Sequence, residues 1–191
     1  MPPAGRRPFL RRFAALSLGA LAGVAGAQIT GEDLDVPYVT TPQNVVDAML
    51  ALAGIGPDDV LLDLGSGDGR IVITAATRFR ARGTGIEIDP RLVERAREGA
   101  RSAGVADLAT FREQDLFATD LTQASVITLY LLPAVNLKLR PLLQKLKPGT
   151  RVVSHDWDMG DWLPDKVLTV AAPDKKIGLA KTSRLMLWVI K

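Results

Sequence analysis

The stretch from Asp59 to Arg70, which reads DVLLDLGSGDGR, constrains the fold more than any other part of the chain. An unbroken apolar run enters a turn with glycines at positions 65, 67 and 69. Such a run, without polar alternation, is typical of a strand covered on both faces in the parallel sheet of an α/β protein. Glycine permits positive φ angles and lets a ligand lie against the backbone, and the helix that follows points its free N–H groups into the same space. The stretch therefore predicts a buried strand, a ligand-binding turn and the start of a helix.

The glycine spacing and the acids beside it favour one class of ligand. A dinucleotide site of the NAD type has the pattern G-x-G-x-x-G, which would place its third glycine at position 70. That position holds Arg70, and Asp63 and Asp68 lie beside and within the turn. Two carboxylates would repel a pyrophosphate, but they suit the amino group and the ribose hydroxyls of an amino-acid nucleoside.

Residues 62 to 70, LDLGSGDGR, closely resemble the first motif of class I S-adenosylmethionine (SAM)-dependent methyltransferases. The resemblance implies that the chain is such a methyltransferase and that SAM is its cofactor. It places these residues in the cofactor site: Asp63, Gly65, Ser66, Gly67, Asp68 and Gly69.

Two later segments resemble further parts of the same cofactor site. Glu87 stands 22 positions after Gly65 at the end of a predicted strand over 84–89, where an acid can accept hydrogen bonds from both ribose hydroxyls, and Ile88 follows it. The alternative is an ordinary exposed charge at a strand end. After a third predicted strand over 109–113, Gln114 and Asp115 resemble the position that binds the adenine amino group. The alternative for Asp115 is a residue that only stabilises the turn.

A predicted amphipathic helix precedes the first strand and ends at Gly54. We expect Thr41 to be its N-cap and Pro42 its first residue. Tyr38, just before it, resembles the lid entry of lysine-methylating members of the family, in which a tyrosine lies near the methionine end of SAM. A packing role for Tyr38 at the helix entry is the alternative.

Alternating helices and strands are predicted along the rest of the chain. Further helices are expected over 70–79, closed by residues 81–83, and over 91–103 and 134–146; Asp89 should cap the second of these three, and Pro141 should break or kink the third. The remaining strands are expected over 126–133, 151–155, 166–172 and 184–190. The order predicts an α/β, doubly wound, Rossmann-like domain over residues 36–191, with a mostly parallel seven-stranded sheet that ends in an antiparallel hairpin.

The acceptor of the methyl group should lie at the carboxyl ends of the fourth and fifth strands. Chemistry in a doubly wound sheet belongs at these ends, so residues 130–133 should face the methyl group. The chain lacks the Asn/Asp-Pro-Pro-aromatic motif of many amide- and nucleobase-directed methyltransferases here, and we expect no nucleic-acid partner. The segment 155–162 holds the only histidine, three acids and two tryptophans, and either packs over the sheet edge or lines the acceptor pocket. It makes a poor metal site, and no metal is expected. Tyr130 and Asp156 are the candidate catalytic residues for the case of an amine acceptor, because an amine must lose its proton before it attacks.

The acceptor itself is implied only by a closer resemblance. Residues 63–70, Tyr38 and the segment after the fifth strand most resemble ATP synthase c-subunit lysine methyltransferases and their bacterial relatives, and more distantly the non-SET histone lysine methyltransferases. The acceptor would then be a protein lysine. A small-molecule methyltransferase would share every cofactor motif and is one alternative. The other is not an enzyme: an exported, non-catalytic binding protein with this fold. We expect a monomer.

Residues 1–27 have the pattern of an export signal. Arg6, Arg7, Arg11 and Arg12 precede a short apolar run and the sequence AGA, which ends at Ala27. The pattern RRPFLR is similar to the twin-arginine signal, which exports folded proteins. We expect cleavage after Ala27, a linker over 28–35 and a periplasmic domain; an uncleaved anchor that holds the domain at the inner face of the membrane is the alternative. The net charge of +3 falls to −1 without these four arginines, so it does not indicate nucleic-acid binding.

Overall fold

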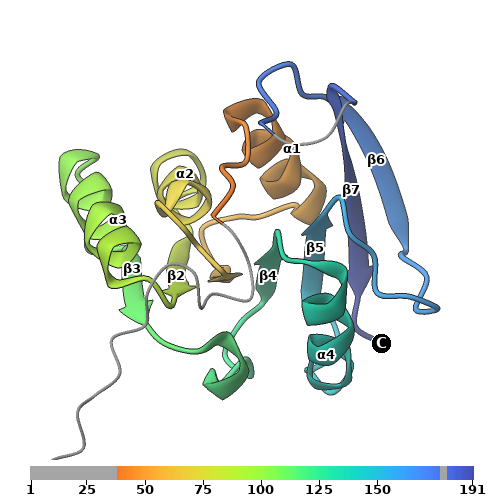
Figure 1. Cartoon of the computed structure of the whole chain (residues 1–191). Coiled ribbons are helices and arrows are strands. Elements are labelled where there is room, and N and C mark those ends of the chain that lie inside the picture. Colours follow the sequence, from red (N-terminus) through yellow and green to blue (C-terminus); the bar gives the residue numbers. More distant parts are fainter. Residues whose placement is uncertain (1–37, 177–179) are drawn as a thin grey trace, which may run out of the picture. The chain divides into compact units, whose positions relative to one another are not determined.

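The computed structural model describes residues 38–176 and 180–191, whose elements are shown in Figure 1. The predicted leader and linker lie outside the described residues. The described part contains a seven-stranded sheet with the order β3-β2-β1-β4-β5-β7-β6. Its strands are β1 (Val60–Leu64), β2 (Arg82–Glu87), β3 (Ala109–Glu113), β4 (Val126–Leu129), β5 (Arg151–His155), β6 (Lys166–Ala171) and β7 (Thr182–Val189).

The sheet confirms the predicted fold class. Strands β1 to β5 are parallel, whereas β7 runs antiparallel to both β5 and β6. The strand order reverses between β1 and β4, and this switch point is where open α/β sheets bind ligands. Asp63 near the end of β1 is paired with Gly85 of β2 and with Thr128 of β4, so three strand ends meet beside the glycines.

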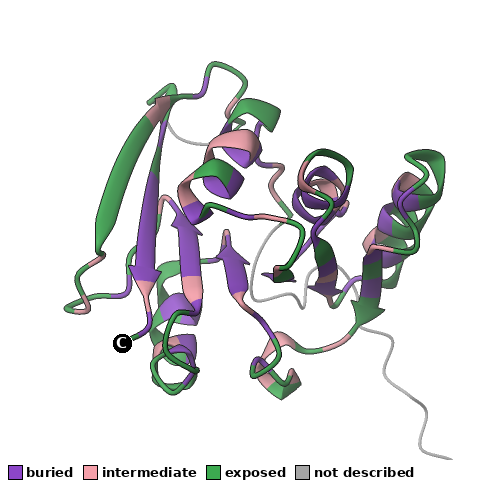
Figure 2. Cartoon of the chain, turned by 180° about the vertical axis from the view of Figure 1, so that it is seen from behind, coloured by how far each residue is buried: buried purple, intermediate pink, exposed green. Residues whose placement is uncertain are grey.

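Helices cover both faces of the sheet. The described helices are α1 (Gln43–Ala53), α2 (Arg70–Phe79), α3 (Pro90–Ser102), the short 3-10 helix η1 (Leu116–Ala118) and α4 (Pro133–Leu143). The first three share one apolar core with Val126 and Val153, while α4 shares the other core with Ile127 and Val152. Because neighbouring residues of a strand point to opposite faces, these two cores explain why the central strands are apolar throughout. Figure 2 shows β5 and β7 mostly buried and the edge strand β6 mostly exposed.

Two local predictions were wrong, and a third was wrong in part. Residues 82 and 83 do not close α2 but begin β2, where Gly83 pairs with Leu61 of β1 and Ala109 of β3; a Cβ on Gly83 would lie 2.7 Å from Val72 of α2. The N-cap of α1 is Pro42, and the Thr41 hydroxyl instead lies 3.4 Å from Nδ1 of His155. Of the predicted break or kink at Pro141, the break does not occur, because α4 continues through Pro141 to Leu143. Pro141 lies on the exposed side of α4, where solvent can hydrogen-bond the carbonyl that loses its N–H partner.

The predicted cap of α3 is confirmed. Asp89 accepts a hydrogen bond from the backbone N–H of Arg91 at 2.9 Å, and Pro90 is the first residue of the helix. Within the described ranges, none of the helices is both long enough and apolar enough to cross a bilayer.

Candidate active site

The turn at residues 65–69, the glycine turn, lies at the carboxyl end of β1. The backbone N–H groups of Gly65 and Ser66 both donate to the carbonyl of Ile86, each at 2.9 Å, which fixes the turn to β2. Gly67 has a φ of +54°, and a Cβ on it would lie 2.6 Å from the ring of Tyr38. No other residue type therefore fits this position without displacing Tyr38.

Glu87 is held against the glycine turn by backbone donors. One of its carboxylate oxygens accepts from the N–H of Gly67 at 2.9 Å, and the other accepts from the N–H groups of Ile88 and Asp89 at 2.8 and 3.0 Å. Three donors leave about one acceptor position free, because a carboxylate can accept about four hydrogen bonds. The carboxylate is thus fixed in position at the end of β2 and can still accept from a ligand.

Asp68 and Arg70 connect the glycine turn to the segment before α1. The guanidinium of Arg70 donates to the Asp68 carboxylate at 2.8 and 2.5 Å and to the carbonyl of Thr41 at 2.7 Å. Although burial acts to raise it, Arg70 holds the pKa of Asp68 below its ordinary value. Burial and the Asp68 carboxylate raise the pKa of Tyr38. The turn and the entry to α1 therefore form one bonded unit.

Asp63 is buried beneath the glycine turn. Its carboxylate accepts a hydrogen bond from the Thr128 hydroxyl at 2.6 Å. Burial raises the pKa of Asp63 to about 7; Thr128 opposes this rise, and the carboxylates of Glu87 and Asp68 add to it. A cation placed beside Asp63 would favour its charged form.

Gln114 and Asp115 follow β3 and are bonded locally. The backbone N–H of Gln114 donates to the carbonyl of Glu87 at 3.0 Å, which joins the ends of β2 and β3. Asp115 caps η1 by accepting from the N–H of Phe117 at 2.8 Å, and the Gln114 side chain donates to Ala118 and Thr119. The turn-stabilising role of Asp115 is thus present in the structure, and its second carboxylate oxygen accepts no hydrogen bond from the residues that the structure describes.

Tyr130 and His155 lie together at the ends of β4 and β5. Their rings are stacked, with centroids 3.9 Å apart and planes at 26°. The Tyr130 hydroxyl is buried and has no hydrogen-bond partner among residues 38–176 and 180–191. Burial and the Asp156 carboxylate raise its pKa to about 12, so Tyr130 stays protonated at neutral pH. It is therefore a hydrogen-bond donor and not a base.

His155 is neutral at pH 7. Its Nε2 lies 2.7 Å from the Ser183 hydroxyl, and its ring is fully buried. Burial lowers the pKa of His155 to about 4, against the effect of Asp156 and with a further lowering from Lys175. The neutral imidazole thus carries no charge, and it positions Tyr130 through the stacked rings.

Asp156 is already engaged by three partners. It adopts a left-handed φ of +62°, and its carboxylate accepts from the backbone N–H of Arg184 at 3.0 Å. The other carboxylate oxygen lies 2.6 Å from Nζ of Lys175 and 3.5 Å from Nε2 of His155. The sequence placed Asp156 at this edge, but it gave no signal for Lys175 or Ser183, which arrive from the antiparallel hairpin.

The segment 155–162 contributes to both faces of the sheet. His155 and Asp156 lie at the candidate site, whereas Trp162 packs against Trp188 with ring centroids 5.6 Å apart. Trp162 joins the apolar core on the α4 side. The packing interpretation is therefore confirmed for Trp162. Trp157 is partly exposed, and its carbonyl accepts from Ser154 and Asn136.

The polar groups around the glycine turn fit an amino-acid nucleoside. A Cβ on Gly67 does not fit beside Tyr38, and the Ser66 hydroxyl is buried without a partner in the described part of the chain. Glu87 and Asp63 provide one fixed carboxylate and one whose charge depends on a neighbouring cation. A search of the described residues finds no group of three or more His, Asp or Glu side chains that could hold a metal ion.

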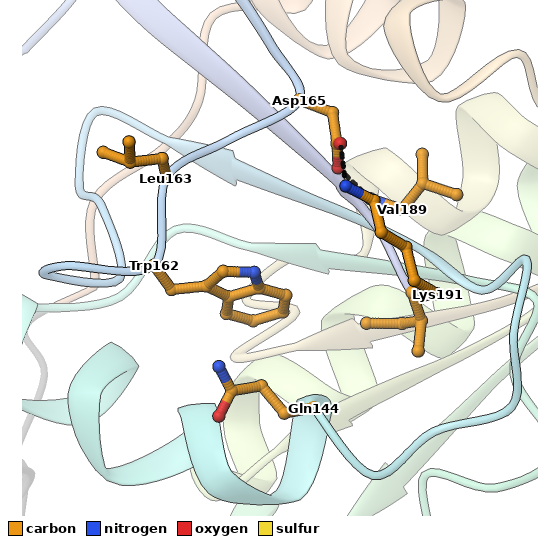
Figure 3. A pocket seen from close by; sticks show the side chains of 7 residues that line it. Gln144, Trp162, Leu163, Asp165, Val189 and Lys191 are labelled. Carbon is orange, nitrogen blue, oxygen red and sulfur yellow. Dashed lines mark hydrogen bonds and ion pairs between the residues drawn. The ribbon is translucent and has the colours of Figure 1, made fainter.

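A surface pocket of about 370 Å³ lies elsewhere (Figure 3). Val189, one of its lining residues, pairs with Arg151 at the start of β5, so the pocket is at the amino ends of the parallel strands, away from the glycine turn. Asp165 in its wall accepts from the N–H of Val189 at 2.8 Å and pairs with Lys191. The pocket is lined by Gln144, Trp162, Leu163, Asp165, Val189, Ile190 and Lys191.

Comparison with known proteins identifies the family. Residues 63–166 match the model of the ANTKMT methyltransferase domain. The chain belongs to the ANTKMT methyltransferase domain family. It is 44% identical over 137 residues to a protein-lysine N-methyltransferase of Saccharolobus islandicus, covering 71% of this chain and 85% of that protein. It is 35% identical over 136 residues to the adenine nucleotide translocase lysine N-methyltransferase of mouse, but spans only 59% of that enzyme's length.

A crystal structure supports the methyltransferase fold and the cofactor. An RNA methyltransferase of Salinibacter ruber, in complex with S-adenosyl-L-homocysteine, superimposes with a TM-score of 0.73 and is 55% identical. The superposition covers 80% of this chain and 94% of that protein. This member of the ANTKMT methyltransferase domain family is therefore a SAM-dependent methyltransferase with a Rossmann-like fold.

Proposed function

We propose that this methyltransferase transfers the methyl group of SAM to the ε-amino group of a lysine in a protein. The observation that carries the proposal is the set of groups at the ends of β4 and β5. These are the protonated Tyr130 hydroxyl, which has no partner among the described residues, the neutral His155 and the carboxylate of Asp156. A carboxylate beside a neutral aromatic pair attracts an ammonium group and can take its proton. The names of the archaeal and mouse relatives support the same acceptor.

The cofactor is proposed to lie along the glycine turn, from Tyr38 to the end of β3. Asp63 would face the amino group and Glu87 the ribose hydroxyls. Asp115 and Gln114 would lie at the adenine amino group, and Tyr38 at the methionine end. The backbone of Gly65, Ser66, Gly67, Asp68 and Gly69, together with Ile88, would complete the contacts.

The protein's part in the reaction is positioning and proton transfer. Bound SAM supplies a methyl group on a sulfonium, which is a good leaving group. Tyr130 donates a hydrogen bond at the site and, being protonated, cannot serve as the base. Asp156 takes the proton of the acceptor amine, directly or through water, while His155 holds the Tyr130 ring. Alignment of the amine and exclusion of water then lower the barrier.

An acceptor assay tests the proposal. The purified chain is incubated with methyl-labelled SAM and, separately, with lysine-containing protein, RNA or small amines, and the products are hydrolysed and separated by mass. We expect methyl-lysine, and loss of that product in Tyr130→Phe with SAM binding unchanged. Label in RNA instead, as the name of the Salinibacter ruber relative suggests, or only in a small amine, would refute a protein-lysine acceptor.

We also propose that residues 1–27 direct export through the twin-arginine route and that the domain acts as a monomer. The paired Arg6 and Arg7 support the route. A full-length chain fused to a reporter that is active only outside the cytoplasm should show signal, and Arg6→Lys with Arg7→Lys should abolish it. Retention of the signal by this double variant would exclude the twin-arginine route. Sedimentation of the exported chain checks the oligomeric state.

A further inference from the structure

The loop between β6 and β7 returns to the acceptor edge of the sheet. Because β7 runs antiparallel to β5, its first residues lie beside the carboxyl end of β5, where His155 pairs with Leu185. Lys175 in this loop extends its side chain inward. Its Nζ lies 2.6 Å from a carboxylate oxygen of Asp156 and 2.8 Å from the carbonyl oxygen of Thr182.

The burial of Lys175 separates it from the other described lysines nearby. Its side chain is only 10% exposed, whereas Lys176 and Lys181 are exposed residues. Lysine is among the residues that proteins bury least, because the ammonium loses its hydration. Here the buried amine lies against the carboxylate that is proposed to receive the acceptor's proton, close to the stacked rings of Tyr130 and His155.

We infer that Lys175 is itself a methyl acceptor, so that the enzyme methylates its own loop within one molecule. The inference rests on the proposed lysine specificity. An external lysine would have to bring its amine to Asp156 beside Tyr130, and the chain already holds a lysine amine at that carboxylate. The site that recognises the substrate's ammonium is therefore occupied from within.

Methyl transfer from SAM to Lys175 needs only Nζ, the Asp156 carboxylate and the sulfonium. The ammonium of Lys175 gives a proton to the Asp156 carboxylate, and the freed lone pair of Nζ forms a bond to the methyl carbon of SAM. The bond between that carbon and sulfur breaks, its electron pair stays on sulfur, and S-adenosyl-L-homocysteine leaves. The methylated nitrogen is already a cation with two N–H groups, and the proton on Asp156 passes to solvent, which restores the carboxylate.

The hydrogen bonds of Lys175 set the expected degree of methylation. An ammonium has three N–H donors, and two are used here, toward Asp156 and toward the Thr182 carbonyl. A single methyl group leaves two donors, so both contacts survive. A second methyl group would remove one of them, and monomethyl-lysine should therefore dominate.

Mass spectrometry of the full chain tests the inference. The purified protein is incubated with SAM that carries a deuterated methyl group, digested and sequenced by tandem mass spectrometry. We expect label on Lys175 and none on Lys176 or Lys181. The labelled fraction at a given time should not change over a tenfold range of protein concentration, because the step occurs within one molecule.

Matched variants separate this step from ordinary surface labelling. Lys175→Arg keeps the cation at Asp156 and should remove the label from the loop, whereas Lys176→Arg should leave it unchanged. Label on all three lysines alike, or a labelled fraction that rises in proportion to protein concentration, would overturn the inference. So would methylation of an external lysine with Lys175 unlabelled, although the proposed function would then stand. If the chain binds SAM and labels no lysine anywhere, the proposed function fails as well.

Discussion

At the carboxyl ends of β1 and β2 the hydrogen bonds come mostly from the backbone, whereas at the ends of β4 and β5 they join side chains. The proposed cofactor end, formed by Asp63, the glycine turn and Glu87, is fixed mainly by N–H groups of the turn and of the residue that follows β2. The proposed acceptor end, formed by Tyr130, His155 and Asp156, is fixed by Ser183 and Lys175 from the hairpin. A site fixed by backbone groups suits a cofactor of constant shape. A site fixed by side chains can change by substitution to fit another acceptor, without disturbing the cofactor site.

Burial shifts the pKa of one titratable group at each end, in opposite directions. Burial raises the pKa of Asp63 to about 7 and lowers that of His155 to about 4. Both shifts favour the neutral form, as expected when a charge is removed from water. A cation can restore the charge on Asp63, but the neutral imidazole of His155 is held in place as it is.

The largest expected effect is at the cofactor end, in Gly67→Arg. The new side chain would start 2.6 Å from the Tyr38 ring on a backbone with φ of +54°, so we expect no detectable SAM binding by calorimetry. Gly104→Arg is the matched control, because Gly104 also has positive φ but has open space around it. Full binding by Gly67→Arg would remove the glycine turn from the site.

The next effect isolates the acceptor end. Tyr130→Phe removes a buried hydroxyl that has no partner among the described residues, so the free energy of unfolding should not fall. We expect kcat for methyl transfer to drop about 100-fold, a typical loss for a positioned proton-transfer or hydrogen-bonding group. SAM affinity should stay at the native value. An equal loss of SAM affinity would mean that the two ends are not separable.

Glu87→Ala should weaken SAM binding by about 1–3 kcal/mol, the cost of losing hydrogen bonds to a charged acceptor. Glu113→Ala is its control, since Glu113 pairs with Glu87 across β2 and β3 but is exposed. Titration calorimetry of both variants measures the difference. If the affinity of Glu87→Ala matched that of the control, Glu87 would be an ordinary strand-end charge.

The contrast between the two ends explains what the sequence could and could not predict. The strand, turn and helix at residues 59–79 follow from local pattern, and Glu87 from its fixed distance to the turn. Lys175 and Ser183 carry no such pattern, because they reach His155 and Asp156 through strand pairing between distant segments. Thr41 and Pro141 were mispredicted for the same reason: local propensity favoured a cap and a break, and tertiary contacts or solvent exposure decided otherwise.

SAM affinity should depend on pH through Asp63. With a pKa of about 7, Asp63 is mostly protonated at pH 5.5, and a neutral carboxyl attracts the cofactor's ammonium weakly. Affinity should fall by up to about tenfold per pH unit as the pH drops below 7. In Asp63→Asn the affinity should be lower at pH 7.5 and nearly constant with pH. A native affinity that does not change between pH 5.5 and 7.5 would exclude this contact.

The smallest expected effect is the pH dependence of native stability between pH 4.5 and 6.5, because the two ends oppose each other there. His155 binds a proton more readily in the unfolded state, so its contribution to the unfolding free energy rises with pH. Asp63 binds a proton more readily in the folded state, so its contribution falls with pH over the same window. Each contributes up to about 1.4 kcal/mol per pH unit, and the native sum should be near zero. Denaturant titrations should therefore show stability rising with pH in Asp63→Asn and falling with pH in His155→Gln. Parallel curves for both variants and the native chain would mean that burial does not shift these two groups, and the electrostatic difference between the cofactor end and the acceptor end would disappear.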